Sequence, residues 1–311
     1  MPPKILTYNA TLSGRENLTD SLGVFHVAPD AGIPEGSWFV PGQYMTIGLN
    51  TEDPAKGSVQ RPMSIASAPQ RRDAVEFYIR YVDNPTSDAP LTHPLWKTAE
   101  GDRLFLREKP KGHFTLEHTV GNDDPRLKIF VAAGTGLAPF LSIVRDHHNR
   151  NPSARLDRFV MLHGASYPAD LGYMDEQREL AERHGLVYLP TVSRPGEARD
   201  WNGCTGRVED FFLEERLEGI ERAAGLGPGE LSPNNAVVFV CGLQGTIGMS
   251  IIRLAERGFV PGDRRLRRVL EIPDDVPASL YYEQYDTEPV IDLDDEELVS
   301  GLRRKLATGL P

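Results

Sequence analysis

The chain has 311 residues, 40% of them hydrophobic and 25% charged, with a formal net charge of -11. That length can bury more than one core, and the composition is that of a folded globular protein, which excludes general disorder. The negative charge opposes binding of nucleic acid and of anionic membranes. Two cysteines exclude both a disulfide framework and a four-thiolate iron–sulfur cluster within this chain.

The sequence suggests neither a membrane-spanning segment nor an N-terminal signal peptide. No apolar stretch approaches the ~20 residues needed to span a bilayer, and residues 1–4 lack the apolar core of a signal peptide. We therefore expect a cytoplasmic protein without membrane or nucleic-acid partners, and we predict no metal site.

The first third of the chain contains short strand-like runs at residues 24–27, 44–49, 75–81 and 104–106, separated by clusters of Pro, Gly, Asp and Asn. The third run alternates as a half-buried strand does, with one face formed by Val75, Phe77, Ile79 and Tyr81 and the other by Glu76, Tyr78 and Arg80. Because an antiparallel barrel is the simplest way to close so many short strands, we predict a β-barrel domain over 1–122.

A short motif, Arg61-Pro62-Met63-Ser64, follows one β-like stretch. The guanidinium of Arg61 is suited to pairing with a phosphate, and Ser64 offers a hydroxyl group to a flat heterocycle. Further on, Thr92 is placed to cap a short helix whose first amides could take up a second phosphate. In the alternative interpretation Thr92 caps its helix and contacts no ligand.

The pattern changes at a polar breaker, residues 121–125. Beyond it, apolar strand-like runs at 128–133, 159–163, 187–192 and 236–241 alternate with helical stretches at about 138–148, 169–184, 208–217 and 244–257. Such alternation predicts an α/β domain over 123–285 with a Rossmann-like parallel sheet, whose ligands bind at the carboxyl ends of the strands.

Two glycine-containing motifs lie at those ends. Gly134-Thr135-Gly136 connects a strand to a helix start, where free amides and missing β-carbons would let a pyrophosphate approach, and Pro139 fits the first helical turn. Cys241-Gly242 ends the last apolar strand and leaves room for a planar ring. In the alternative interpretation, the Gly134–Gly136 motif is only a tight strand-to-helix turn, and Cys241 is only a buried hydrophobic residue.

Two features near the C-terminus stand apart from these domains. One is a basic run formed by Arg264, Arg265, Arg267 and Arg268, with Arg71 and Arg72 far upstream. In the alternative interpretation this run is only a solvated surface. In the extension 286–311, acids precede Leu298, Leu302 and Leu306 and bases follow Leu302, so that we predict a short helix docked on a neighbouring surface.

Taken in order, these motifs resemble the ferredoxin–NADP reductase family, in particular its bacterial ferredoxin or flavodoxin reductases. The resemblance extends from about residue 22 to 285, and it rests on the segments RPMS, FYIRY, GDRLFL, KGHFTL, VAAGTGLAPFLSI, HGASYPADLGY, VSR, TGR, FVCG and YYEQY. It implies an FAD-binding antiparallel barrel followed by an NADP-binding α/β domain.

The resemblance also implies roles for single residues. Those expected at FAD are Arg61, Pro62, Met63, Ser64, Ile79, Arg80, Tyr81, Leu91 and Thr92, with Ser64 beside the flavin N5 and Tyr285 in the closing segment. Those expected at NADPH are Gly134, Thr135, Gly136, Pro139, Ser166, Arg194, Arg207, Cys241 and Gly242. The catalytic residues it implies are Ser64, Cys241 and Glu283.

This chain departs from the family pattern in three places, one of which is its continuation past Tyr285, near which bacterial relatives often end. Met63 stands where the family usually has an aromatic residue, and Ser166 where bacterial relatives often have arginine. Arg194 and Arg207 match positions that contact a 2′-phosphate, which favours NADPH over NADH.

The implied activity is electron transfer between NADPH and a separate ferredoxin or flavodoxin through FAD. An acidic ferredoxin would suit the arginine run. The alternatives are the flavin reductase component of a multicomponent oxygenase and a noncatalytic nucleotide-binding module.

Overall fold

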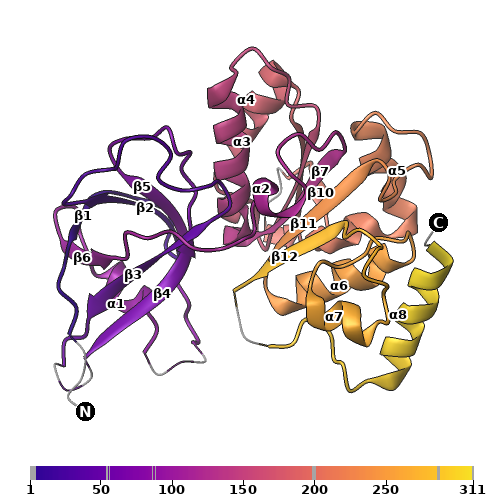
Figure 1. Ribbon diagram of the computed structural model, residues 1–311. Coiled ribbons are helices and arrows are strands. Elements are labelled where there is room, and N and C mark those ends of the chain that lie inside the picture. Colours follow the sequence, from indigo (N-terminus) through magenta and orange to yellow (C-terminus); the bar gives the residue numbers. More distant parts are fainter. Residues whose placement is uncertain are drawn as a thin grey trace. The chain divides into compact units, whose positions relative to one another are not determined.

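The computed structural model describes residues 5–53, 55, 57–85, 87, 89–197, 201–285 and 288–309. Its chain divides into two compact units, the first formed by 1–122 with 138–152 and the second by 123–137 with 153–311. Figure 1 shows the elements of the chain, and each unit has a hydrophobic core of its own. The helix that begins at Ala138 thus belongs to the first unit, although its sequence lies within the predicted nucleotide domain. The bounds of that domain as a separately folding piece stay a prediction.

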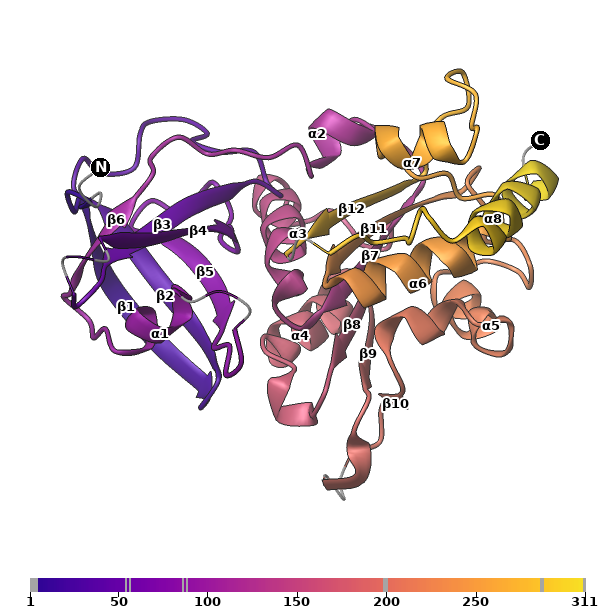
Figure 2. The same ribbon diagram turned by 90° about the horizontal axis from the view of Figure 1, so that it is seen from below.

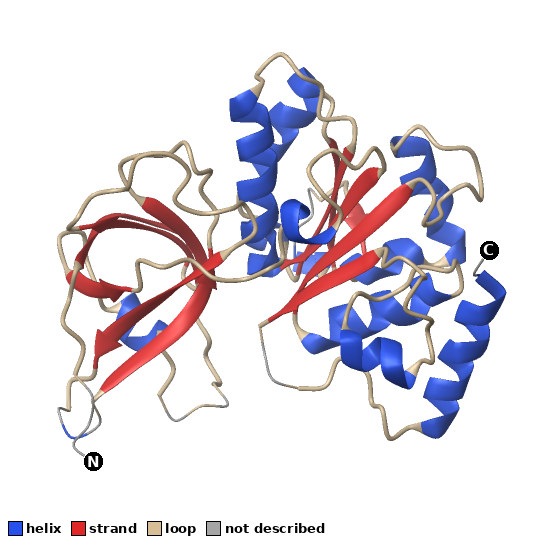
Figure 3. Cartoon of the chain, viewed as in Figure 1, coloured by secondary structure: helices blue, strands red, loops and turns tan. Residues whose placement is uncertain are grey.

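The first unit is built on an antiparallel sheet of six strands in the order β4-β3-β6-β1-β2-β5. The strands are β1 (Ala10–Thr19), β2 (Leu22–Pro29), β3 (Tyr44–Asn50), β4 (Ser58–Ser64), β5 (Val75–Arg80) and β6 (Arg103–Leu106). A bridge between Ile65 and Phe77 joins the two outer strands, so that the sheet closes around buried side chains such as Phe25 and Ile47. The predicted barrel is therefore confirmed. Among the described residues of 5–122, this unit also contains the short helices α1 (Thr92–Trp96) and α2 (Leu116–Thr119), drawn in blue in Figure 3.

The motif that begins at Arg61 is part of a strand and does not follow one. Arg61, Pro62, Met63 and Ser64 form the second half of β4, where Arg61 lies opposite Ile47 of β3. Pro62 is tolerated here because β4 is an outer strand of the sheet. The N–H group that proline lacks therefore interrupts no ladder between central strands.

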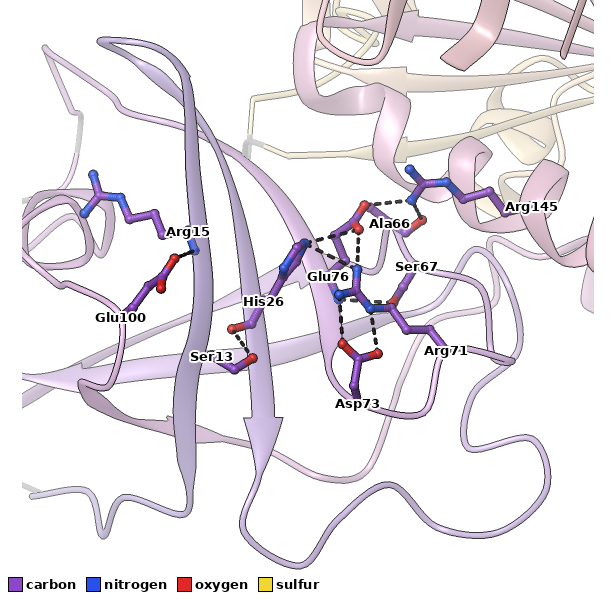
Figure 4. A network of polar contacts seen from close by, with 10 residues as sticks. All are labelled: Ser13, Arg15, His26, Ala66, Ser67, Arg71, Asp73, Glu76, Glu100 and Arg145. Carbon is purple, nitrogen blue, oxygen red and sulfur yellow. Dashed lines mark hydrogen bonds and ion pairs between the residues drawn. The ribbon is translucent and has the colours of Figure 1, made fainter. Parts of the chain in front are cut away.

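The prediction that β5 is half-buried is wrong, because both of its faces are covered. Glu76 is 6% and Tyr78 4% exposed. Glu76 accepts hydrogen bonds from Arg71 at 2.8 Å and from Arg145 of α3 (Ala138–Arg150) at 2.7 Å, with His26 at 3.4 Å (Figure 4). Two guanidinium groups thus compensate the buried carboxylate and hold α3 against the barrel.

The residues that follow β4 are held in the same way. Ser142 of α3 donates from its hydroxyl to the carbonyl oxygen of Ser67 at 2.8 Å, and Arg145 donates to that of Ala66 at 2.9 Å. The backbone next to Ser64 is therefore fixed by the helix that follows the glycine-rich turn.

The second unit contains a parallel sheet of six strands in the order β10-β9-β8-β7-β11-β12. The strands are β7 (Leu127–Ala133), β8 (Phe159–Ala165), β9 (Val187–Val192), β10 (Cys204–Thr205), β11 (Ala236–Gly242) and β12 (Leu280–Gln284), and the helices are α4 (Met174–His184), α5 (Glu214–Ala223), α6 (Gln244–Ala255), α7 (Arg264–Val269) and α8 (Glu296–Gly309). Helices α5, α6 and α8 lie on one side of the sheet and α4 on the other (Figure 2). The predicted α/β fold is confirmed.

Two predicted helices are divided. The stretch predicted at 169–184 forms a 3₁₀ turn, Pro168–Asp170, and then α4, because Tyr173 between them has a left-handed φ of 59°. The stretch predicted at 208–217 forms the 3₁₀ helix Val208–Phe212 and then α5, with the extended residue Leu213 between them.

The extension after the last strand belongs to the core of the second unit. Helix α8 buries Val299, Leu302 and Leu306 in that core, while Leu298 is only partly buried. The carbonyl oxygen of Val290 lies so close to Gly248 of α6 that a β-carbon there would stand 2.2 Å away. The predicted docked helix is therefore present, although residues 286–287 and 310–311 lie outside the described part. None of the described helices is long and apolar enough to cross a bilayer.

Candidate active site

In the first unit, Arg61 presents a fixed guanidinium group. It donates to the carbonyl oxygen of Gln60 at 2.8 Å, to the hydroxyl of Ser87 at 3.0 Å and to the carbonyl oxygen of Ala89 at 3.0 Å. These contacts hold the planar fork against the loop that precedes α1. A guanidinium restrained in this way loses little entropy when it pairs with a phosphate.

The neighbouring positions of β4 differ in exposure. Pro62 is exposed, Met63 is partly buried and packs against the barrel core, and Ser64 is 7% exposed at the end of the strand. The thioether of Met63 thus has contacts within the barrel itself.

The predicted cap at Thr92 is wrong. Leu91 is the residue that precedes α1, in a helical conformation and without a side-chain cap, and Thr92 is the first residue of the helix itself. The hydroxyl oxygen of Thr92 instead accepts a hydrogen bond from the N–H of Val82 at 3.4 Å. Thr92 therefore ties the loop after β5 to α1.

Four other positions predicted to contact a cofactor lie in the same region. Ile79 and Leu91 are buried, and Tyr81 stacks on His93 with ring centroids 4.8 Å apart and an interplanar angle of 15°. Tyr81 and His93 form a planar aromatic pair next to the loop that fixes Arg61, and Arg80 precedes them at the end of β5. The first unit thus places a fixed cation, a hydroxyl group and stacked rings around the ends of β4, β5 and α1.

In the second unit, the two glycines of the strand-to-helix turn have different functions. Gly134 has a φ of 56° and a β-carbon there would meet no atom within 4 Å. At Gly136 a β-carbon would lie 2.1 Å from the carbonyl oxygen of Cys241. The expectation that both glycines leave room for a pyrophosphate therefore needs correction, because only Gly134 borders open space. Pro139 is the second residue of α3, as predicted.

The ends of β11 and β12 bring three predicted residues together. Cys241 pairs with Glu283 across the two strands, and Cys241 is fully buried. Burial, and after it the charge of Glu283, raises the pKa of the Cys241 thiol well above its usual value. The hydroxyl of Tyr285 donates to the carbonyl oxygen of Thr135 at 3.2 Å, and its backbone N–H donates to that of Gly242. Cys241 is thus a neutral thiol beside the glycine-rich turn.

The register of β8, β9 and β10 places Ser166, Arg194 and Arg207 just beyond the carboxyl ends of three adjacent strands. The backbone N–H of Arg194 donates to the carbonyl oxygen of Ser166 at 2.9 Å, and its guanidinium lies over the ring of Tyr167, 6.0 Å from the centroid. Arg207 is exposed. These residues could bind an anion at this edge.

Two residues of this edge were missed by the sequence reasoning. Arg216 of α5 donates to the carbonyl oxygen of Thr205 at 2.6 Å. Glu209, in the 3₁₀ helix after Arg207, is buried. The position of Glu209 two residues after Arg207 is the one sequence signal that could have drawn attention to it.

The arginine run is only partly available to a partner. Arg264, Arg265 and Arg268 are exposed on α7, whereas Arg267 donates to the carbonyl oxygens of Pro273 at 2.7 Å and Val276 at 2.8 Å. The upstream pair serves the fold: Arg71 holds Glu76, and Arg72 donates to the carbonyl oxygen of Gly36 at 2.8 Å. Within the described ranges, no three side chains of the His, Cys, Asp or Glu type gather as metal ligands.

Comparison with known proteins agrees with this architecture. Residues 130–250 match the family model of the oxidoreductase NAD-binding domain. A ferredoxin–NADP reductase of Pseudomonas aeruginosa is 30% identical over 267 residues, which cover 80% of this chain and 92% of that protein. The reductase component of a phenol 2-monooxygenase from Pseudomonas sp. strain CF600 is 28% identical, covering 65% of this chain and 52% of that component.

A solved structure shares the fold. The ferredoxin NADP+ reductase from Neisseria gonorrhoeae, crystallised with bound FAD and NADP, has a TM-score of 0.69 and 22% identity, covering 90% of this chain and 98% of that one. The barrel, the parallel sheet and the close relation to the Pseudomonas aeruginosa protein together show that this chain belongs to the ferredoxin–NADP reductase family.

Proposed function

We propose that this chain is a flavoprotein oxidoreductase that transfers electrons between NADPH and a separate one-electron carrier, a ferredoxin or a flavodoxin, through FAD. The observation that carries the proposal is the packing of the Gly134–Gly136 turn on the Cys241 carbonyl, with Tyr285 bonded to Thr135. It joins a dinucleotide-type turn to the strand end where we expect a flat ring to lie against the backbone.

The first unit has groups that fit FAD. Arg61, held by Ser87 and Ala89, would bind the pyrophosphate, and the loop from Leu91 to Thr92 would lie beside it. Ile79, Arg80 and Tyr81 would line the cofactor, and Pro62 and Met63 would lie next to Arg61. Bound FAD accepts a hydride and gives up electrons singly. Ser64, at the fixed end of β4, would donate a hydrogen bond near the flavin N5.

The second unit has groups that fit NADPH. The open space at Gly134 would admit the pyrophosphate, while Arg194, Arg207 and Ser166 would surround the 2′-phosphate. Cys241 and Gly242 would position the nicotinamide. The raised pKa of Cys241 keeps its thiol protonated, so that it packs as a neutral group and does not attack the ring.

Glu283 and Tyr285 complete the proposed site. Glu283, paired with Cys241 in the sheet, would stabilise charge or relay a proton. Tyr285 would lie at the place where the nicotinamide enters. The exposed arginines of α7 would contact the acidic face of the carrier.

A single spectroscopic experiment tests the core of the proposal. The purified full chain is expected to be yellow, with flavin absorbance bands that NADPH bleaches in the absence of air. A colourless protein that takes up no FAD when it is supplied in excess would contradict the assignment, and would leave a noncatalytic nucleotide-binding module as the alternative.

The similarity to a phenol 2-monooxygenase reductase component supports a second candidate, the flavin reductase of a multicomponent oxygenase. With two cysteines this chain holds no four-thiolate cluster of its own, so that a separate iron–sulfur protein would be required. Titration of the NADPH-reduced chain with ferredoxins, flavodoxins and oxygenase components distinguishes the two. Rapid reoxidation by a ferredoxin or flavodoxin supports the first, and reoxidation by oxygenase components alone supports the second.

A further inference from the structure

Glu209 is a buried carboxyl group next to the arginine that the proposed function assigns to the 2′-phosphate. Its side chain is 2% exposed, whereas that of Arg207 is 71% exposed. The Oε1 atom of Glu209 lies 3.8 Å from Nη1 of Arg207, and Oε2 has no hydrogen-bond partner in the described part of the chain. A buried carboxylate with an unpaired oxygen is costly, so that this arrangement favours the protonated form.

The other charges on this side of the unit are compensated by different partners. Arg253 of α6 donates to Oδ1 of Asp210 at 2.8 Å, and Oδ2 of Asp210 accepts the backbone N–H of Arg207 at 2.7 Å. Arg216 of α5 donates to the carbonyl oxygen of Thr205. Arg207 is thus the cation that lies within ion-pair distance of Glu209, while Arg253 also favours its charged form electrostatically.

Among the described residues, the titratable groups on the remaining elements packed on the 3₁₀ helix are paired or neutral. Lys128 of β7 pairs with Asp124 at 3.4 Å. His163 of β8 is neutral, because burial lowers its pKa to about 3. Glu221 of α5 accepts the backbone N–H groups of Gly229 and Leu231.

We propose that Glu209 is a specificity-determining residue that takes up one proton from solvent when Arg207 turns from it toward the 2′-phosphate of the dinucleotide. The inference rests on the proposed function, since it deepens the assignment of Arg207. A nucleotide without the 2′-phosphate leaves Arg207 beside Glu209 and causes no uptake at this position.

The direction of the effect follows from electrostatics. Burial, and with it the charge of Asp210, raises the pKa of Glu209 above its usual range, although its own backbone amide, Arg207 and Arg253 oppose that shift. A phosphate of about -1.5 to -2 charges both draws Arg207 away and adds negative charge, and each change raises the pKa further. Because binding of the 2′-phosphorylated nucleotide is coupled to proton uptake, its affinity falls as the pH rises through the pKa that Glu209 has in the free protein. Preference for the 2′-phosphorylated nucleotide therefore declines with rising pH.

Binding of two nucleotide fragments to the full chain tests this inference without using the flavin. Calorimetric titrations with 2′,5′-ADP and with 5′-AMP, between pH 5.5 and 8.5 in buffers of different ionisation enthalpy, give both affinity and proton uptake. The test variant is Glu209→Gln. The matched control, Glu218→Gln, also removes one carboxylate, but from an exposed side chain that pairs with Arg222 at 3.1 Å in the natural chain.

We expect Glu209→Gln to bind 2′,5′-ADP about tenfold more tightly than the natural chain at pH 8.5, the order expected for two unit charges about 12 Å apart at an effective dielectric constant of about 20. The difference in affinity should shrink toward pH 5.5, because the raised pKa of Glu209 favours its protonated form as the pH falls. The variant should also take up fewer protons, whereas Glu218→Gln and all titrations with 5′-AMP should match the natural chain.

Unchanged affinity and proton uptake in Glu209→Gln, with 2′,5′-ADP still preferred over 5′-AMP, would overturn the inference and leave the NADPH assignment standing. Equal binding of both fragments by the natural chain at every pH would remove the 2′-phosphate site itself, and with it both proposals. If Glu209→Gln does not fold, the carboxyl ¹³C shift of Glu209 in the natural chain decides, because its titration must move to higher pH when 2′,5′-ADP is added.

Discussion

The hydroxyl group of Tyr285 donates a hydrogen bond to the carbonyl oxygen of Thr135 over 3.2 Å, although 150 positions separate the two residues. The backbone N–H of Tyr285 is bonded to the carbonyl oxygen of Gly242 at 3.2 Å. Its side chain is still 42% exposed. An accessible aromatic ring is thus tied to both segments that we assign to the dinucleotide.

Replacing Tyr285 with Phe should ease entry of the nicotinamide. Loss of a hydrogen bond worth about 1 kcal/mol makes the ring easier to move, so that we expect KM for NADPH to fall about fivefold in a dye-reduction assay. Tyr281→Phe is the matched control, because its hydroxyl donates to the carbonyl oxygen of Ala278 in the same unit. A KM that rises in Tyr285→Phe would show that the hydroxyl binds the nucleotide instead.

The two glycines of the turn should respond differently to alanine. A β-carbon at Gly136 would lie 2.1 Å from the Cys241 carbonyl oxygen, so that Gly136→Ala should lower the free energy of unfolding by about 3 kcal/mol. Gly134→Ala meets open space and should cost about 1 kcal/mol, from its left-handed φ alone. Denaturant unfolding of both variants measures the difference. Equal losses would mean that the turn does not pack on β11 as described.

The sequence predicts strands well where both faces are buried. β7, β8 and β11 are almost entirely buried and largely apolar, whereas β9 is only partly buried, and the predicted positions of all four differ from the structure by at most two residues at an end. β1 has no comparable apolar run, because only Ala10 and Leu12 of its ten residues are buried, and its polar remainder is ordered by pairing with β2. Tertiary pairing, which no local pattern encodes, decides such strands.

The candidate site also contains residues that local sequence predicts and residues whose environment depends on distant contacts. Glycine and arginine at strand ends were predictable, because parallel strands bring their carboxyl ends to one edge. The exposed face expected for Glu76 could not be corrected from sequence, since its partner Arg145 lies 69 positions away. Thr92 shows the converse: its residue type fits a cap, but the helix begins one residue earlier than a cap would require.

Ser64→Ala should slow reduction of the bound flavin much more than it weakens NADPH binding. In our proposal Ser64 donates a hydrogen bond near N5, which matters most as charge develops there, and the loss of one such donor costs about 10²-fold or more in enzymes that rely on it. Anaerobic single-turnover reduction by NADPH gives both constants. Ser58→Ala, at the other end of β4, is the control. A reduction rate equal to that of the natural chain would refute this role for Ser64.

The exposed arginines of α7 should matter for the protein carrier and not for a small acceptor. We expect Arg264→Gln, Arg265→Gln and Arg268→Gln together to weaken reduction of an acidic ferredoxin, and to reduce its dependence on salt, without affecting dye reduction. Arg267 is left intact, because it binds the Pro273 carbonyl. Three exposed arginines elsewhere, Arg158, Arg178 and Arg222, provide a control with the same change in charge. A parallel loss of both activities would mark the α7 arginines as structural.

Stability should fall below neutral pH partly because of His163. Burial lowers its pKa to about 3 from the ordinary 6.5. The unfolded chain therefore takes up a proton below pH 6.5 that the folded chain refuses until about pH 3, and unfolding is favoured progressively over that interval. From this group we expect the free energy of unfolding to be about 1.4 kcal/mol lower at pH 5.5 than at pH 7.5. In His163→Gln, denaturant unfolding should show a difference in unfolding free energy between the two pH values that is smaller by that amount. His113→Gln, which alters an exposed histidine, should retain nearly the whole difference of the natural chain. If the two variants show the same pH difference, His163 is protonated in the folded state and its burial does not exclude the charge.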